Sequence, residues 1–185
     1  DDEVLGVGMP CGGKMEVYVE PFLPQPELML VGQGRIAELV AELGRLLHFR
    51  VTVNSPGATR EDFPFADQLI TDDTDYQKIN PGLNSYVIVL TQHKGDQQVI
   101  QAALRGTPRY IGLVASAKRS RLVVEYLKEG GMDTDALRQV LRAPCGLDLG
   151  GRTPEEIALS IITEVVKLRH ERTGLSMMEV KQCSI

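Results

Sequence analysis

Tryptophan is absent from the sequence, and cysteine and histidine are scarce, with three residues of each among 185. The cysteines, Cys11, Cys145 and Cys183, are odd in number and far apart, so they form neither a CxxC pair nor the spacing of a zinc finger. We therefore expect reduced thiols in a cytoplasmic protein. No apolar run approaches the roughly 20 residues of a membrane helix, and the opening residues DDEVLGVG do not resemble a signal peptide.

Basic residues are also in the minority, because 20 lysines and arginines stand against 25 aspartates and glutamates, for a formal net charge of -5. A general nucleic-acid-binding protein needs a net basic face to hold the phosphate backbone, so that class is disfavoured, although a local basic pocket is compatible with this composition. The hydrophobic content of 43% is that of an ordinary globular protein. A chain of this length can bury a core as one domain.

Short apolar segments alternate with segments of helical periodicity. Strands are predicted at Met15–Glu20, Glu27–Val31, Phe49–Val53, Gln68–Thr71, Tyr86–Leu90 and Arg109–Val114. Helices are predicted at Ile36–Leu47, Gln97–Leu104, Ser116–Glu129, Asp133–Leu141 and Thr153–Arg172. This alternation predicts an α/β fold with a Rossmann-type, doubly wound, mostly parallel sheet. We divide the chain into an N-terminal appendage with one strand and a proline-rich linker (1–26), a Rossmann-like domain (27–172) and a C-terminal tail without a firm pattern (173–185).

A glycine-rich turn, GQGRIA, follows the second predicted strand and opens the next helix. The first glycine permits the tight turn, the second lets the backbone approach a pyrophosphate, and the small alanine lets the helix lie close to the strand. The free N–H groups at the helix N-terminus attract phosphate. We therefore predict binding of a phosphate-bearing ligand here, with a tight turn that binds nothing as the alternative. The candidate residues are Gly32, Gln33, Gly34, Arg35 and Ile36.

The end of the next strand lacks the carboxylate that nicotinamide-dependent enzymes use to hold the ribose hydroxyls, about 20 residues after the glycine turn. This sequence has Asn54 and Ser55 there. NAD is therefore disfavoured, and NADP, with Arg60 as a contact for its 2′-phosphate, is the alternative nucleotide. Asn54 is a candidate binding residue, and its other interpretation is a turn residue before Pro56.

Positive charge gathers at the start of the predicted helix Ser116–Glu129. Cations at a helix N-terminus oppose the helix dipole, and a bound anion would turn this arrangement into a favourable one. Ser116, Lys118 and Arg119 are therefore predicted as a second anion contact, at the same edge of the sheet as the glycine turn. The alternative is a solvated basic face.

Three loops supply further candidates. Cys11 lies in a PCGG segment that we expect to be flexible, and it is a candidate thiolate ligand of a soft metal, with an incidental thiol as the alternative. The neighbouring glycines allow close approach to a ligand. We expect the loop after YVIVL to reach the cleft. The loop APCGLDLGG, which precedes the capped final helix, is a second candidate for a ligand contact. In both places the alternative is a loop that contacts no ligand. The candidates are Gly12, Gly13, Thr91, His93, Gly146 and Asp148.

Six phrases together resemble the XdhC/CoxF family, the accessory proteins of xanthine dehydrogenase and carbon monoxide dehydrogenase. They are PCGGKMEVYVEP (10–21), LVGQGRIA (30–37), HFRVTVNSP (48–56), YVIVLTQHKGD (86–96), YIGLVASAKR (110–119) and APCGLDLGGRTPEEIALSI (143–161). The specificity of the resemblance comes from their order and spacing. The TQHKGD loop is closer to the CoxF branch than to members with a second histidine there.

The resemblance implies a cofactor chaperone rather than a redox enzyme. Family members bind molybdenum cofactor (molybdopterin, in some forms joined to a nucleotide), protect it and help insert it into a molybdenum hydroxylase apoenzyme. The family's CGG, glycine-turn, basic helix-start and GLD motifs map onto the candidates named above. A cysteine desulfurase, a separate protein supplying the family's N-terminal domain, and a second copy of the chain are further partners that the resemblance implies. Members commonly have Asp where this chain has Asn54.

The sequence thus predicts an accessory protein that binds molybdenum cofactor and helps insert it into a hydroxylase such as carbon monoxide or xanthine dehydrogenase. Two alternatives stay open, an NADP-dependent oxidoreductase and a non-catalytic nucleotide-binding interaction module, because a fold alone does not fix a function. No residue is assigned a catalytic role.

Overall fold

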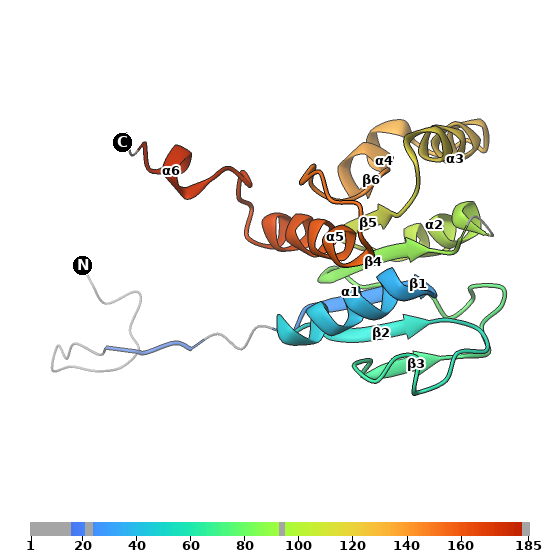
Figure 1. The fold of residues 1–185 in the computed structure, drawn as a ribbon, viewed down its shortest axis with the longest axis horizontal. Helices are drawn as coiled ribbons and strands as arrows, with labels where there is room; N and C mark the ends of the chain where they lie inside the picture. The colour runs from blue at the N-terminus through green and yellow to red at the C-terminus, as the bar shows by residue number, and fades with distance from the viewer. Residues whose placement is uncertain (1–15, 21–23, 93–94, 183–185) are drawn as a thin grey trace, which may run out of the picture.

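The computed structural model describes residues 16–20, 24–92 and 95–182 (Figure 1). Within these ranges the chain forms a six-stranded sheet in the order β3-β2-β1-β4-β5-β6. Every pair of neighbouring strands is parallel. This is the Rossmann order, in which the direction of chain progression reverses between β1 and β4. The predicted fold class is confirmed.

The four inner strands are short and largely buried, as expected for a parallel sheet covered on both faces, whereas β3 at the edge is more exposed. The register pairs Val31 with Asn54 and Gly32 with Leu90, so the carboxyl ends of the three central strands lie at one level. The strands are β1 (Glu27–Gly32), β2 (Arg50–Asn54), β3 (Gln68–Ile70), β4 (Ser85–Leu90), β5 (Tyr110–Leu113) and β6 (Leu141–Arg142).

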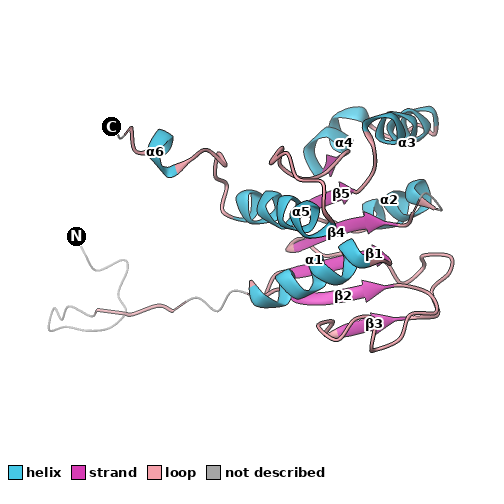
Figure 2. Cartoon of the chain, in the orientation of Figure 1, coloured by secondary structure: helices cyan, strands magenta, loops and turns pink. Residues whose placement is uncertain are grey.

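Helices cover both faces of the sheet (Figure 2). On one face α1 (Arg35–Leu46) and α5 (Pro154–Arg169) pack side by side. On the other face lie α2 (Asp96–Arg105), α3 (Ala117–Glu129) and α4 (Thr134–Val140). The short α6 (Met177–Val180) lies apart from these layers, and its side chains are exposed. Along the described ranges, no helix combines the length and the apolar character needed to cross a bilayer.

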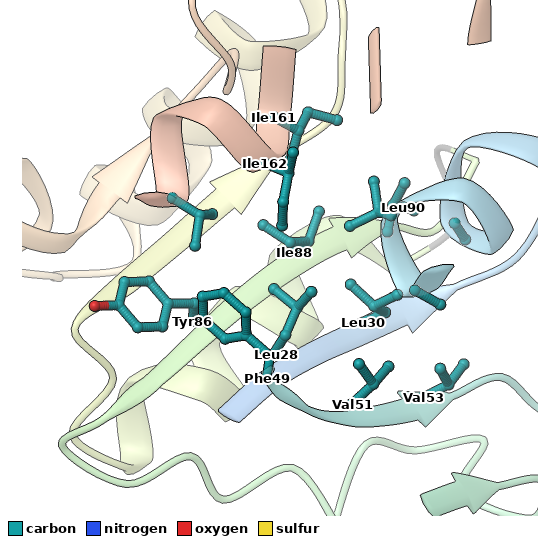
Figure 3. Packing of buried hydrophobic residues seen from close by; sticks show 14 of the residues in the cluster. Leu28, Leu30, Phe49, Val51, Val53, Tyr86, Ile88, Leu90, Ile161 and Ile162 are labelled. Atoms are coloured by element: carbon teal, nitrogen blue, oxygen red, sulfur yellow. The ribbon is translucent and has the colours of Figure 1, made fainter. Parts of the chain in front are cut away.

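Each central strand sends alternate side chains into two separate cores. Leu28 and Leu30 of β1 face α1 and α5, where Ile161 of α5 lies over the sheet (Figure 3). Met29 and Val31 of the same strand belong to the opposite core, with α2 and α3. Because successive residues of a strand point to opposite faces, a continuous apolar run such as ELMLV serves both layers.

Two predicted elements are corrected by the structure. Residues Glu16–Glu20, where a strand was predicted, form no strand in the described part of the chain, and Tyr18 is 90% exposed. Alternation alone does not make a strand, because a strand needs a partner for its backbone hydrogen bonds. Leu141, predicted as the end of a helix, instead begins β6 and pairs with Ile111 of β5.

Candidate functional site

The glycine turn lies where β1 passes the end of β4. Gly32 has φ +132°, and a Cβ at this position would lie 2.1 Å from the carbonyl oxygen of Leu90. Only glycine allows this approach of the two strands. Gly34 is the N-cap of α1, and no side chain of the described residues caps the helix there. The N–H groups of the first turn are therefore available to an anionic ligand.

A cavity of about 180 Å³, called the main cavity below, opens at the carboxyl ends of β1, β2 and β4. Two further hollows, of about 230 and 280 Å³, share Gln33 and Gly34 as lining residues and contain Gln92. Sites for cofactor-sized ligands measure about 300–1,000 Å³, so an extended ligand would span the turn rather than fill one hollow. The main cavity is lined by Val31, Gly32, Gln33, Asn54, Ser55, Pro56, Tyr76 and Thr91.

Asn54 is buried at the wall of the main cavity and is fixed by Asp73, which is also buried. The Asn54 Nδ2 group donates to Asp73 Oδ2 over 2.5 Å. Asp73 accepts two more hydrogen bonds, from the backbone N–H groups of Gln77 (2.8 Å) and Lys78 (3.1 Å). The residue at the end of β2, Asn54, is neutral. In the folded chain the Asp73 carboxylate lies within hydrogen-bond distance of its amide.

Two polar atoms at this wall are left without a partner. Among the described residues, Asn54 Oδ1 and Ser55 Oγ find no hydrogen bond, although each residue is only 1% exposed. An unpaired buried polar atom costs about 1–3 kcal/mol, and native proteins keep only a few of them. A ligand that supplied hydrogen bonds here would remove this cost.

Thr91 lies on the far side of the main cavity and joins a small polar network. Its hydroxyl donates to Asp96 at the start of α2, and the Arg119 guanidinium donates to the other oxygen of Asp96 at 3.0 Å. Asp96 is only 2% exposed, so its charge is held by these neighbours. The predicted binding residue Thr91 therefore does reach the cleft, and Arg119 is already paired with a carboxylate.

The predicted basic helix start forms a hollow of its own. Ser116, Lys118, Arg119 and Leu122 line a space of about 310 Å³, separate from the main cavity. Ser116 caps α3, since its Oγ accepts from the backbone N–H of Arg119 at 3.2 Å. Asp96 supplies part of the negative charge that the sequence pattern assigned to a ligand. A second anion contact at this helix stays a prediction.

Arg35 and Ile36 lie at the rim of the hollow beside α5. The Arg35 guanidinium is 3.2 Å from a carboxylate oxygen of Glu38 and 3.6 Å from one of Glu155. Both pairs are largely exposed and contribute little to stability, so Arg35 can exchange them for a ligand at small cost.

Gly146 and Asp148 are not among the residues that line the main cavity. The backbone N–H of Gly146 donates to Glu164 of α5 at 2.8 Å, and Glu164 also accepts from the Tyr110 hydroxyl at 2.6 Å. Burial raises the pKa of the adjacent Cys145 thiol to about 12, so this cysteine is protonated at neutral pH and does not act as a thiolate. Asp148 is exposed on the same loop.

Four predicted candidates, Cys11, Gly12, Gly13 and His93, lie outside the described residues. Sequence reasoning in turn missed Tyr76 and Gln92, which line the main cavity and a neighbouring hollow, and Asp73, which holds Asn54; it noted Ser55 without making it a candidate. For Asp73 a signal existed, because it comes three residues after the short strand β3. The carboxyl ends of parallel strands meet at one edge, so an acidic residue there belongs to the cleft.

Comparison with known proteins gives consistent matches. The model for the XdhC Rossmann domain matches residues 28–165. The uncharacterised protein YqeB of Escherichia coli K12 is 27% identical over 181 residues, which is 94% of this chain and 33% of that protein. A protein of Bacillus subtilis 168 described as a probable subunit of xanthine dehydrogenase is 30% identical over 163 residues, which is 83% of this chain and 46% of that protein.

Among solved structures, a crystal structure of a xanthine dehydrogenase from Bacillus halodurans superposes with a TM-score of 0.69 and 26% sequence identity. The match covers 80% of this chain and 45% of that one. The chain therefore spans less than half the length of the relatives it matches.

Proposed function

The chain belongs to the XdhC family, and on this basis we propose that it is the cofactor-binding domain of an accessory protein that matures a molybdenum hydroxylase. The cargo is molybdenum cofactor, a pterin that carries a phosphate and in some forms a nucleotide. The recipient is an apoenzyme such as xanthine dehydrogenase or carbon monoxide dehydrogenase. The CoxF-like branch, a cysteine desulfurase partner, a partner supplying an N-terminal domain, and a homodimer belong to the same proposal.

The observation that carries the proposal is the main cavity beside the uncapped start of α1. A phosphate placed at Gly34 would meet free backbone N–H groups and the positive end of the helix. The turn is narrow because Gly32 has no side chain, which lets β1 pass close to the end of β4. These features fit a cargo that carries a phosphate. This fit does not depend on any contact with molybdenum.

The competing oxidoreductase function is disfavoured by the residues around the cavity. NADP needs a cation for its 2′-phosphate, whereas the wall at the end of β2 presents Asn54 backed by Asp73. Arg60, the sequence candidate for that contact, is exposed, and the main cavity is lined by other residues. The interaction-module alternative predicts a nucleotide in the cleft and no reaction on it.

The test is the ligand that the protein holds. The chain is purified without oxygen from cells that make molybdenum cofactor, and bound pterin is measured by fluorescence after oxidation, in parallel with a titration by NADPH. We expect pterin to copurify in amounts that approach one per chain. Saturable NADPH binding without pterin would overturn the proposal in favour of the oxidoreductase, and binding of neither ligand would favour the interaction module.

A variant that adds a negative charge tests whether the phosphate binds at the glycine turn. Gln33→Glu adds one negative charge at the exposed turn with little change in shape, and we expect it to weaken pterin retention about five- to tenfold by repelling the phosphate. Gln101→Glu places the same change on the exposed face of α2 and should have no effect. Equal retention by both variants would contradict a phosphate site at the glycine turn.

A further inference from the structure

The wall of the main cavity formed by Asn54 and Ser55 has a defined hydrogen-bonding character. Asp73 receives three N–H donors, one of them the Asn54 amide. An amide oxygen turned toward this carboxylate would face another acceptor, so the side chain of Asn54 has one acceptable orientation. Its Nδ2 group points to Asp73, and its Oδ1 atom is left over as an acceptor.

The same wall is rigid. The backbone N–H of Ser55 donates to the carbonyl of Ile70 at 2.9 Å, and the N–H of Gly57 donates to the carbonyl of Thr71 at 3.0 Å. These bonds tie the residues after β2 to the end of β3. Asn54 and Ser55 both line the main cavity, and among the described residues neither of these two side-chain oxygens has a hydrogen-bond partner.

A ligand group that fits this wall must donate a hydrogen bond to Asn54 Oδ1 and exchange one with the Ser55 hydroxyl. Two neighbouring hydroxyls do this, since each hydroxyl can donate and accept. The position also lies at the end of β2, where Rossmann-type proteins that bind nucleotides hold the ribose with a carboxylate. We propose that Asn54, oriented by Asp73, together with Ser55 forms a binding site for the 2′- and 3′-hydroxyls of a nucleotide ribose.

Asparagine here takes the place of the usual carboxylate as an acceptor without carrying its charge. The nearby Asp73 charge and the Asn54 Oδ1 acceptor repel a ribose that bears a 2′-phosphate. The site therefore distinguishes an unmodified ribose from its 2′-phosphorylated form. This inference deepens the proposed function and rests on it for the cargo, which would be the form of molybdenum cofactor that is joined to a nucleotide.

Simple nucleotides test the site without the cofactor. ADP and CDP are compared with 2′-deoxy-ADP and 2′-deoxy-CDP, and NAD⁺ with NADP⁺, by isothermal titration calorimetry. For at least one base, we expect the ribose form to bind about three- to tenfold more tightly than its deoxy form, which is the effect of one hydrogen bond. We expect NAD⁺ to bind at least tenfold more tightly than NADP⁺. Equal binding of ribose and deoxyribose forms, or absence of nucleotide binding, would overturn the inference.

Three variants assign the effect to residues. Asn54→Leu removes the acceptor with little change in volume and should abolish the preference for ribose. Asp73→Asn releases the orientation of Asn54 and should reduce the preference, while thermal unfolding verifies that the chain is folded. Asp72→Asn is the matched control, because Asp72 is exposed and its carboxylate contacts Lys78 instead. A preference that survives Asn54→Leu would overturn the assignment even if Asp73→Asn fails to fold.

The two proposals fail separately. A preference for ribose in a protein that never holds pterin would keep the ribose site and remove the cofactor function. Pterin that copurifies with a protein indifferent to the 2′-hydroxyl would keep the cofactor function and remove the ribose site.

Discussion

Gly32 is the single residue on which the geometry of the cleft depends most directly. Its positive φ is a conformation that a residue with a side chain adopts only with strain. Its neighbour Leu90 leaves no space for a Cβ, since the built distance of 2.1 Å is far below any real contact. Strain and steric overlap with backbone atoms therefore act together at Gly32.

Replacement of this glycine should separate the two effects. We expect Gly32→Ala to lower the free energy of unfolding by about 2–4 kcal/mol, because β1 and β4 must move apart. Gly131→Ala is the control, since Gly131 has φ +83° and open space around its Cβ position. The control should lose only about 1–2 kcal/mol through strain. Urea unfolding followed by circular dichroism measures both, and equal losses would show that the overlap is relieved without cost.

At the scale of elements, two helices begin with the same capping arrangement in different surroundings. In α5 the Thr153 Oγ accepts from the Glu156 N–H, and the Glu156 carboxylate accepts from the Thr153 N–H. Ser176 and Glu179 repeat this arrangement in the four-residue α6. Only α5 packs against α1 and the sheet, so only its cap is coupled to the stability of the domain.

Removal of each cap tests this coupling. Thr153→Ala should lower the free energy of unfolding by about 0.5–2 kcal/mol, the usual contribution of an N-cap. Ser176→Ala should leave it unchanged within about 0.5 kcal/mol, because α6 can fray without exposing the core. Both are measured by chemical denaturation at pH 7. A comparable loss in the Ser176 variant would mean that the tail packs on the domain in solution.

The pH dependence of the α5 cap follows from the lowered pKa of Glu156. The backbone N–H of Thr153 is the main cause, followed by that of Arg152, since both donate to the charged carboxylate. A group with a lowered pKa in the folded state stabilises the fold above the pKa of a free glutamate. That contribution is lost as the pH falls through the lowered value. The stabilising effect of this cap is therefore greatest at neutral pH and fades in acid.

The whole molecule consists of two cores that share one sheet. Ile88 and Val89 are neighbours in β4, yet Ile88 belongs to the core under α1 and α5, and Val89 to the core under α2 and α3. Both side chains are fully buried. Because the backbone of β4 connects them, loss of packing on one face removes support from the other.

Unfolding should therefore be a single event. We expect Ile88→Ala to cost about 2–5 kcal/mol and Val89→Ala somewhat less, because it loses fewer methyl groups. Leu83→Ala is the control, since Leu83 is 80% exposed, and it should change stability by less than about 0.5 kcal/mol. Circular dichroism and tyrosine fluorescence should give coincident transitions for every variant. Separate transitions in either core variant would show that the two layers unfold independently.

The sequence by itself determined the succession of strands and helices in the domain apart from β6, the glycine turn and the capped start of α5. These features depend on residues close together in the chain, where hydrophobic period and turn chemistry are visible directly. The XdhC family could also be recognised from short phrases in order, and the match over residues 28–165 confirms it, whereas the CoxF-like branch stays a prediction. The cytoplasmic location and the cofactor stay predictions.

Only the tertiary structure decided which polar groups meet. Asn54 and Asp73 are 19 residues apart, and Arg119 and Asp96 are 23 apart, and neither pair follows from a local spacing. The first pair exists because β3 lies beside β2, and the second because α2 lies beside α3. Asparagine at the end of β2 was interpreted from the sequence as the loss of a ribose ligand. The Asp73 carboxylate fixes its amide, and the Asn54 Oδ1 atom stays without a partner among the described residues at the wall of the main cavity.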